Sequence, residues 1–296
     1  MTQSAPFGTV LTAMATAFAP DGSVDLEATQ GIARHLVAHG HDGLVVSGTT
    51  GESPTTTKEE DGETLTAVRE AVGPDVHLVA GVGTNDTSTS IWLAQQARKC
   101  GADGILLVTP YYNKPGQRGI LHHFRQVVDA AELPVMLYDV PGRTGSAIDL
   151  ASYEQMAGWE QVVAVKDALG DFPRAARITQ LGYALYSGDD VNTLGFLAHG
   201  ACGVVSVAGH AAGTEIARMI STFQSGDHAG ALAIYQRLLP AFAAIMGVPN
   251  YGATTAKAAL ELLGVLDNRR VRSPLVELDD DEVAALRAGL DASGLL

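Results

Sequence analysis

The sequence predicts an α/β fold, namely a (β/α)8 TIM barrel with a C-terminal helical appendage. Eight short runs rich in Val, Ile, Leu and Ala recur along the chain, and stretches of helical periodicity separate them. The runs are apolar on both faces, which is typical of parallel strands buried between two layers. Eight strand–helix units fit a barrel, whose typical length is about 250 residues. The alternative is an open doubly wound sheet, which normally carries a glycine-rich phosphate loop after its first strand, where this chain reads FAPDGS.

Turn and capping residues bound the predicted elements. The strands are expected in GTVLTAMAT, DGLVVSG, VHLVAGVG, DGILLVTP, LPVMLYDV, QVVAVKDA, YALYSGDD and CGVVSVAG, which begin near residues 8, 42, 76, 103, 133, 161, 183 and 202. Thr57 and Glu60 have the spacing of a capping box, and Gly73 marks the end of the helix that they begin. Asp86 and Gly101 bracket another helix in the same way.

Two regions are expected along the chain. Residues 1–225 form the barrel, and residues 226–296 form a C-terminal helical extension, because the strand signal stops and amphipathic stretches follow near 227–245, 252–264 and 280–292. The acidic run from Asp279 to Glu282 lacks the glycine and the distal glutamate of a calcium loop. It is therefore expected to cap the last helix.

Composition restricts the classes of partner. With 33 acidic and 19 basic residues, the formal net charge is -14, so nucleic acid and anionic membranes would be repelled. No uninterrupted apolar run reaches the roughly 18 to 20 residues that cross a bilayer, and the first residues lack the basic region of a signal peptide. We expect a cytoplasmic protein with no nucleic-acid or membrane partner. Cys100 and Cys202 are the only cysteines and are expected as small core residues.

Lysine usage identifies the first candidate for chemistry. The chain has five lysines, and only Lys166 lies inside an apolar strand, VVAVKDA. Reactive groups of a barrel lie where the strands end, on one face. Burial there would favour the neutral amine that a Schiff-base nucleophile requires. The alternative is a structural ion pair between Lys166 and either Asp167 or Asp189.

Neighbouring turns supply further polar groups. Tyr138 closes the strand before Lys166, so its phenol is expected near the amine, where it could relay protons through Thr50 or Tyr112. Arg143 follows the same strand, and its planar guanidinium could hold a carboxylate by two bonds. The alternatives are tyrosines that only line the rim and an arginine that only faces solvent.

The signals for anion, metal and dinucleotide binding differ in strength. The backbone amides of residues 49–51 form a turn that could take a second carboxylate. His35, His39 and His41 are close in sequence but lie at the end of the first helix, on the stable side of a barrel, and HExxH is absent. The turn Gly81-Val82-Gly83 lacks the last glycine of a dinucleotide fingerprint. We expect no metal and no cofactor.

Five motifs together resemble one known family. The motifs are GTTGESPT after the second strand, VTPYYNKP after the fourth, YDVPGRTG after the fifth, VKDA in the sixth and SGDD after the seventh. In this order and spacing they resemble the dihydrodipicolinate synthase and N-acetylneuraminate lyase superfamily, pyruvate-dependent class I aldolases on a (β/α)8 barrel. The resemblance covers nearly the whole chain.

The resemblance implies a role for each candidate residue. Lys166 would condense with pyruvate, Tyr138 would be the central proton shuttle, and Thr50 and Tyr112 would complete the relay. Thr49 and Thr50 would hold the pyruvate carboxylate. Arg143 would hold the carboxylate of the aldehyde substrate, and Gly188 and the Val207 carbonyl would line the pocket. In the family, the residue matching Tyr112 reaches the neighbouring subunit's site, which implies a homo-oligomer, a tetramer built as a dimer of dimers.

Arg143 indicates the branch of the family. The resemblance implies a synthase that condenses pyruvate with L-aspartate 4-semialdehyde, on the way to diaminopimelate and lysine, because related lyases generally lack an arginine in that turn. The alternatives are a lyase that acts on another 2-keto-3-deoxy acid and a non-catalytic paralogue that binds a keto acid. Asp139 and Gly142 depart from the usual Asn and Ser, which concerns substrate fit and not the reaction class.

The resemblance also implies an effector site for lysine. Ser53, Asn85 and Tyr111 match positions that line such a site in the family. Where inhibited relatives commonly offer histidines and a glutamate, this chain has Lys58, Asp61 and Thr89. Lys58 adds a like charge to a cationic ligand and Thr89 removes an anion, although Asp61 offers one carboxylate. We expect weak or absent inhibition by lysine.

Overall fold

The protein is a closed barrel of eight parallel strands, as the sequence predicts. The structure is a computed structural model that describes residues 4–249 and 251–296. Each strand pairs with the next in chain order, and the eighth pairs with the first. The strands are β1 (Val10–Ala13), β2 (Gly43–Val46), β3 (His77–Gly81), β4 (Gly104–Val108), β5 (Val135–Asp139), β6 (Val162–Asp167), β7 (Ala184–Ser187) and β8 (Gly203–Ser206).

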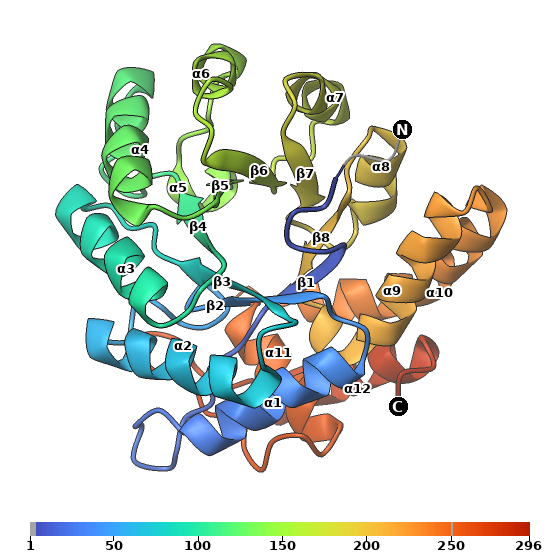
Figure 1. The fold of residues 1–296 in the computed structure, drawn as a ribbon. Helices are drawn as coiled ribbons and strands as arrows, with labels where there is room; N and C mark the ends of the chain where they lie inside the picture. The colour runs from blue at the N-terminus through green and yellow to red at the C-terminus, as the bar shows by residue number, and fades with distance from the viewer. Residues whose placement is uncertain (1–3, 250) are drawn as a thin grey trace.

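Helices surround the barrel and cover its outer face (Figure 1). Each strand is followed by at least one helix, and β5 is followed by two. These helices are α1 (Leu26–Ala38), α2 (Lys58–Val72), α3 (Thr87–Lys99), α4 (Gln117–Ala131), α5 (Pro141–Thr144), α6 (Leu150–Met156), α7 (Phe172–Gln180), α8 (Thr193–Ala198) and α9 (Gly209–Gln224).

The predicted helix caps are confirmed. The Thr57 hydroxyl accepts a hydrogen bond from the Glu60 amide at 3.2 Å, and Glu60 Oε2 accepts one from the Thr57 amide at 2.8 Å. This capping box begins α2, which ends at Gly73 with φ of 72°. Asp86 caps α3 by accepting from the Thr89 amide at 2.8 Å. Side-chain caps of this kind satisfy amide donors that the first helical turn leaves without an intrahelical partner.

Strand alternation decides which side chains reach the barrel interior. On β5, Met136 and Tyr138 belong to the cluster inside the barrel, whereas Leu137 packs against the surrounding helices. On β6, Ala164 belongs to the inner cluster and Val165 to the outer one. Successive side chains of a strand point to opposite faces. Residues 138 and 166 therefore face the interior, and residues 139 and 167 face the helical layer.

Three further helices follow the barrel. They are α10 (His228–Met246), α11 (Ala253–Leu262) and α12 (Asp280–Ala292), and α10 and α11 pack against α9 (Figure 1). These helices and α9 share an apolar cluster that includes Leu238, Phe242 and Leu286. Asp279 and Glu282 form a capping box at the start of α12, as the sequence predicts for the acidic run.

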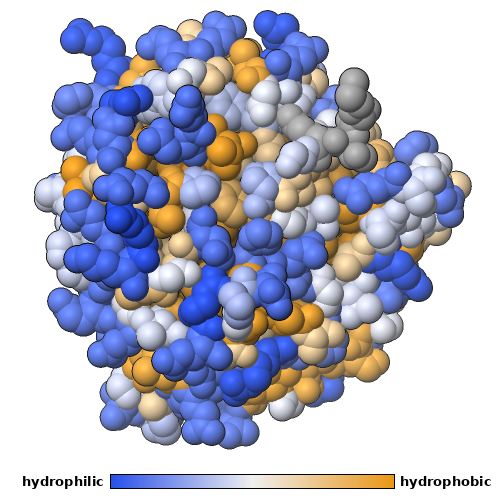
Figure 2. Space-filling view, viewed as in Figure 1, coloured by the Kyte–Doolittle hydropathy of each residue, from blue (hydrophilic) through white to orange (hydrophobic). Residues whose placement is uncertain are grey.

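The hydropathy of helix α10 and of the surface is relevant to whether the protein could contact a membrane. Among the described residues, α10 is long and apolar enough to cross a membrane by length and composition alone, and 33% of that stretch is buried inside the fold. Its residues Leu238, Ala241 and Ile245 pack against α9 and the other appended helices. On the face shown in Figure 2, hydrophilic residues separate the smaller hydrophobic areas. Packing within the appended bundle therefore buries only part of this apolar stretch.

Candidate active site

A cavity of about 720 Å³ lies at the carboxyl ends of the barrel strands. This size and position are typical of a small-molecule site in a barrel of this kind. Its lining includes the predicted residues Thr49, Thr50, Ser53, Tyr111, Tyr112, Tyr138, Arg143, Lys166, Gly188 and Val207. Asn85, the remaining predicted residue, is exposed and is not part of the lining.

Lys166 lies in the interior of this site. Its residue is 4% exposed, and its Nζ lies 4.3 Å from the centre of the Tyr138 ring. Burial lowers the pKa of Lys166 to about 7; the nearby Asp190 carboxylate opposes this shift and Arg143 adds to it. A large share of the amine is consequently neutral near pH 7, which is the form that attacks a carbonyl carbon.

The geometry does not support the alternative that Lys166 forms a structural ion pair with Asp167 or Asp189. Among residues 4–249 and 251–296, no carboxylate lies within ion-pair distance of Lys166. Asp167 faces outward and pairs with Arg174 at 2.9 Å. Asp189 accepts from Asn192 Nδ2 at 2.9 Å. Sequence reasoning missed Asp190, a buried carboxylate that accepts hydrogen bonds from the Val207 and Ala208 amides. Its negative charge raises the pKa of Lys166 electrostatically, without an ion pair between the two side chains.

Tyr138 lies beside Lys166 because the two residues are paired in register across β5 and β6. Both point into the barrel, so the ring and the amine meet above the inner core. Burial raises the pKa of Tyr138 to about 12, although the charge on Arg143 lowers it. The phenol therefore carries its proton at neutral pH and can act first as an acid.

The predicted relay is only partly assembled in a single chain. Thr50 is buried and lines the cavity, whereas Tyr112 is 88% exposed and lies at its rim with φ of 70°. Within the described part of the chain, no hydrogen bond joins the hydroxyls of Thr50, Tyr112 and Tyr138. The relay therefore stays a prediction.

The turn after β2 offers backbone donors. The Thr49 carbonyl accepts from the Glu52 amide at 3.1 Å, and the Gly48 carbonyl accepts from the Ser53 amide at 3.2 Å. The amides of residues 49–51 donate to no acceptor among the residues that the structure describes. Successive free amides in a turn make a concavity that suits a carboxylate.

Arg143 is a guanidinium without an anionic partner. It is exposed, lines the cavity, and its side chain donates to no acceptor in the described ranges. Its closest described partner is the ring of Tyr251, whose centre lies 4.9 Å from Arg143 Cζ. The neighbouring Gly142 also lines the cavity. The fork of donors on Arg143 is therefore free to meet a carboxylate.

Gly188 and Val207 lie in the cavity wall. The Val207 carbonyl is already hydrogen-bonded, because His210 Nδ1 lies 2.8 Å from it and the Ala15 amide donates to His210 Nε2 at 3.1 Å. With Nε2 as the acceptor, Nδ1 carries the hydrogen. The His210 amide also donates to this carbonyl at 3.3 Å, so both lone pairs of the Val207 oxygen are engaged within the fold.

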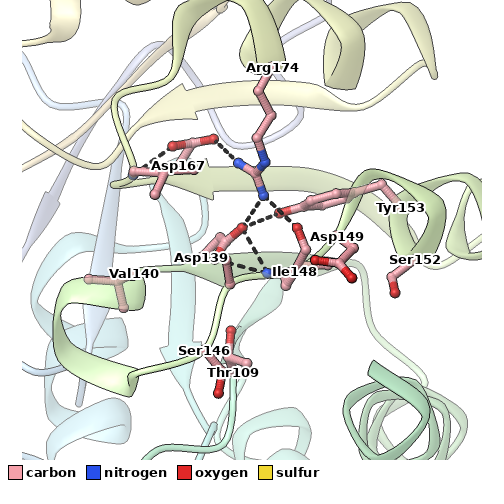
Figure 3. A network of polar contacts seen from close by, with 12 residues as sticks. Thr109, Asp139, Val140, Ser146, Ile148, Asp149, Ser152, Tyr153, Asp167 and Arg174 are labelled. Atoms are coloured by element: carbon pink, nitrogen blue, oxygen red, sulfur yellow. Dashed lines mark hydrogen bonds and ion pairs between the residues drawn. The ribbon is translucent and has the colours of Figure 1, made fainter. Parts of the chain in front are cut away.

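A buried charge network holds the ends of β5 and β6, and sequence reasoning did not find its central residue (Figure 3). Arg174 on α7 donates to Asp139, to Asp167 at 2.9 Å and to the Ile148 carbonyl at 2.7 Å. The Tyr153 hydroxyl donates to Asp139 at 3.2 Å. Asp139 is therefore engaged in this network and is not among the residues that line the cavity, and its effect on substrate fit stays a prediction.

A second buried ion pair was also missed. Lys257 on α11 and Glu52 in the turn after β2 are 2.5 Å apart, Nζ to Oε1. Lys257 is therefore buried like Lys166, although it lies on a helix and not in a strand. A signal was present in the sequence, since Lys257 interrupts the apolar helical stretch ATTAKAALEL.

The predicted effector residues do not form one closed pocket. Ser53 and Tyr111 are half-buried and line the central cavity, and Asn85 offers its carbonyl to Asn113 Nδ2 at 2.8 Å. Lys58 lies over the Trp92 ring at 5.2 Å. Asp61 is buried and accepts from the Thr56 hydroxyl at 2.8 Å, so its carboxylate does not project into solvent.

The three clustered histidines form structural contacts. His41 is buried between the Thr12 hydroxyl at 2.6 Å and the Leu36 carbonyl at 2.7 Å. His35 Nε2 lies 3.0 Å from the His210 carbonyl, and His39 Nδ1 lies 2.7 Å from the His35 carbonyl. Both ring nitrogens of His41 and one of each other ring are thus engaged with hydroxyl or carbonyl oxygens.

Comparison with known proteins agrees with this geometry. The sequence model of the Dihydrodipicolinate synthetase family matches residues 6–293. The 4-hydroxy-tetrahydrodipicolinate synthases of Kineococcus radiotolerans and Acidothermus cellulolyticus are each 54% identical over 293 residues, covering 98% of this chain and 94% of the relative. The crystal structure of the Cyanidioschyzon merolae enzyme with lysine bound is 41% identical, with a TM-score of 0.94, covering 99% of this chain and 100% of the other. This chain belongs to the dihydrodipicolinate synthetase family.

Proposed function

We propose that Lys166 forms a Schiff base with pyruvate. The observation that carries the proposal is a buried amine in the cavity with a pKa lowered to about 7. Its Nζ lies 4.3 Å from the centre of the Tyr138 ring and has no ion-pair partner among the described residues. A buried lysine without a counter-ion is destabilising unless it is neutral. The site therefore keeps the amine in its reactive form.

The enzyme is a lyase of the class I aldolase type in lysine and diaminopimelate biosynthesis. Its reaction condenses pyruvate with L-aspartate 4-semialdehyde to 4-hydroxy-tetrahydrodipicolinate. The Lys166 amine would add to the keto carbon of pyruvate and expel water, and Tyr138 would protonate the leaving hydroxyl. Loss of a methyl proton gives an enamine, whose carbon attacks the aldehyde. The amino group of the semialdehyde then displaces Lys166 as the ring closes.

Two groups would hold the two carboxylates. The free amides of the turn that contains Thr49 and Thr50 suit the carboxylate of pyruvate. The free guanidinium of Arg143 suits the carboxylate of the semialdehyde. Gly188 and the Val207 carbonyl would line the space between them. Thr50 and Tyr112 would complete the proton relay from Tyr138.

The active form would be a homo-oligomer, a tetramer built as a dimer of dimers. Tyr112 supports this proposal, because most of its ring is exposed at the rim of a cavity in which the relay is incomplete. In the oligomer, the Tyr112 ring of each subunit would reach the site of its neighbour and supply its hydroxyl there. We also propose residues 1–225 as the barrel and 226–296 as an extension that contributes to the cavity, and a cytoplasmic location.

Trapping with borohydride tests the nucleophile. Pyruvate and borohydride should add one reduced pyruvate adduct to the peptide that contains Lys166, and Lys166→Ala should abolish it. The peptide that contains Lys257, the other buried lysine, is the internal control. A label at Lys257 instead, or no label at all, would contradict the assignment.

Substrate choice and assembly need separate measurements. Turnover of L-aspartate 4-semialdehyde should exceed turnover of N-acetylneuraminate and of ketodeoxygluconate, and Arg143→Ala should raise the KM for the semialdehyde alone. Arg118→Ala is the matched control, since Arg118 is an exposed arginine outside the cavity. Sedimentation velocity should show a tetramer in the unaltered protein, and a monomer that retains full activity would contradict the proposed role of Tyr112.

A further inference from the structure

Part of the cavity wall comes from the C-terminal extension. Met246, Tyr251, Gly252, Ala253 and Leu275 all line the space above Lys166. Tyr251 is the aromatic residue among these five. It follows α10 and immediately precedes the glycine that begins α11, far in sequence from every barrel strand.

Tyr251 contacts Arg143 in a way that leaves the guanidinium donors free. The Tyr251 ring centre is 4.9 Å from Arg143 Cζ, and the Arg143 side chain donates to no acceptor in residues 4–249 and 251–296. A ring can attract a guanidinium through its face, while the N–H donors of the guanidinium lie in its own plane. The stacking partner therefore restrains Arg143 without competing for the donors that a carboxylate needs.

The backbone beside Tyr251 is itself restrained. Gly252 has φ of 112° and ψ of -99°, a conformation that side-chain-bearing residues rarely adopt. Its amide donates to Thr255 Oγ1 at 3.2 Å. One turn further along α11, Lys257 is fixed by its buried pair with Glu52. The backbone that follows Tyr251 is thus anchored in α11.

Tyr251 and Arg143 line the same cavity as Tyr138. Burial sets the raised pKa of Tyr138, which the charge on Arg143 lowers and Tyr251 raises further. Both side chains are therefore near enough to Tyr138 to act on its charge. The contact between Tyr251 and Arg143 would therefore affect how an aldehyde substrate is oriented as it approaches Tyr138 and Lys166.

We propose that Tyr251 is a positioning residue for Arg143, which orients the guanidinium towards the carboxylate of the aldehyde substrate. The inference rests on the proposed role of Arg143 in binding the semialdehyde. Through Tyr251, the C-terminal extension would help the barrel to select an aldehyde that carries a carboxylate. Pyruvate binding does not depend on the contact, because Lys166 and the turn after β2 hold that substrate.

Replacement of the ring separates this role from a general structural one. Tyr251→Leu should raise the KM for L-aspartate 4-semialdehyde about 2- to 5-fold, the range expected for one cation–π contact. The KM for pyruvate and the borohydride trapping at Lys166 should not change. Tyr251→Phe keeps the aromatic face and should restore the lower KM. Leu232→Ala, an exposed position on α10, is the control within the same extension.

A double-mutant cycle completes the test. In an Arg143→Ala background, Tyr251→Leu should add no further increase in the KM for the semialdehyde, because its effect acts through Arg143. An added increase there, or an equal rise in the KM for pyruvate, overturns the inference. If Arg143→Ala raises this KM and Tyr251→Leu alone does not, only the inference about Tyr251 fails. If Arg143→Ala itself has no effect, the proposed role of Arg143 fails as well.

Discussion

Glu52 and Lys257 form a buried ion pair that joins the turn after β2 to the C-terminal extension. Each side chain is 1% exposed, and Nζ and Oε1 are 2.5 Å apart. Lys257 Nζ also donates to the Arg270 carbonyl at 2.7 Å, and Glu52 Oε2 accepts from the Arg272 amide at 2.8 Å. Burial lowers the pKa of Lys257 only to about 8, so the ammonium stays protonated at neutral pH. The pair fixes the turn that carries Thr49 and Thr50 relative to α11.

Breaking this pair on one side should destabilise the fold strongly. Lys257→Met leaves the Glu52 carboxylate buried without a cation, and we expect a loss of about 3–5 kcal/mol in the free energy of unfolding. Adding Glu52→Gln should recover part of that loss, because it removes the orphaned charge. Urea unfolding measures both. The exposed pair of Arg125 and Asp129 is the control, and Arg125→Ala should cost less than about 0.5 kcal/mol. If the two variants lost equal amounts of unfolding free energy, burial would not explain the effect of Lys257→Met.

Removal of Arg174 should destabilise the ends of β5 and β6. Arg174→Met leaves Asp139 and Asp167 buried without their shared cation, with an expected loss of about 3–5 kcal/mol in the free energy of unfolding. Arg177→Met, on the exposed face of the same helix, should have little effect. Thermal unfolding compares the two variants with the unaltered protein.

The stability of the Arg174→Met variant should also depend on pH with a defined sign. Burial raises the pKa of Asp139 and of Asp167 even with Arg174 present, and removal of the cation raises them further. The folded state then binds protons more tightly than the unfolded state, whose Asp pKa is about 3.9. Stability therefore falls as pH rises through the raised values. The loss in the free energy of unfolding caused by Arg174→Met should be smaller at mildly acidic pH than at neutral pH. A larger loss at mildly acidic pH would contradict the expected direction of the pH dependence.

Imine formation should follow the ionisation of Lys166. Its pKa is lowered to about 7, so the neutral fraction grows as pH rises through that value. The initial rate of pyruvate trapping in the free enzyme should rise between about pH 6 and about pH 8 and then level off. A rate that keeps rising towards the ordinary lysine pKa would show that the amine is not desolvated in solution.

Lysine should inhibit the enzyme weakly or not at all. Lys58 presents a positive charge beside Trp92, and the Asp61 carboxylate is buried against Thr56, so Ser53, Asn85 and Tyr111 lack a neighbouring exposed anion from these positions. The initial rate should be unchanged by sub-millimolar L-lysine. Thr89→Glu, which adds a carboxylate, should increase the sensitivity. Strong inhibition of the unaltered protein would show that other groups complete the site.

Local sequence patterns predicted the barrel and the centre of the site. Apolar runs on both faces gave the eight strands, and the twofold alternation along β5 and β6 places Tyr138 and Lys166 inward. The same alternation turns Asp139 and Asp167 outward, which excludes the ion pair between Lys166 and Asp167 that the sequence left open. These features follow from short-range periodicity, which a single sequence displays directly.

The partners of the buried charges were decided only by tertiary structure. Glu52 and Lys257 are 205 residues apart, and Arg174 meets Asp139 across 35 residues. No periodicity connects such positions, so the sequence could mark Asp139 as unusual but could not name Arg174. Tyr251 reaches Arg143 in the same way, from a helical extension that the sequence separated from the barrel. The sequence by itself thus determined the strands and the inward placement of Lys166 beside Tyr138, because alternation is local. The folded chain decided which distant charges and rings surround them, because burial requires each charge to find a partner wherever packing brings one close.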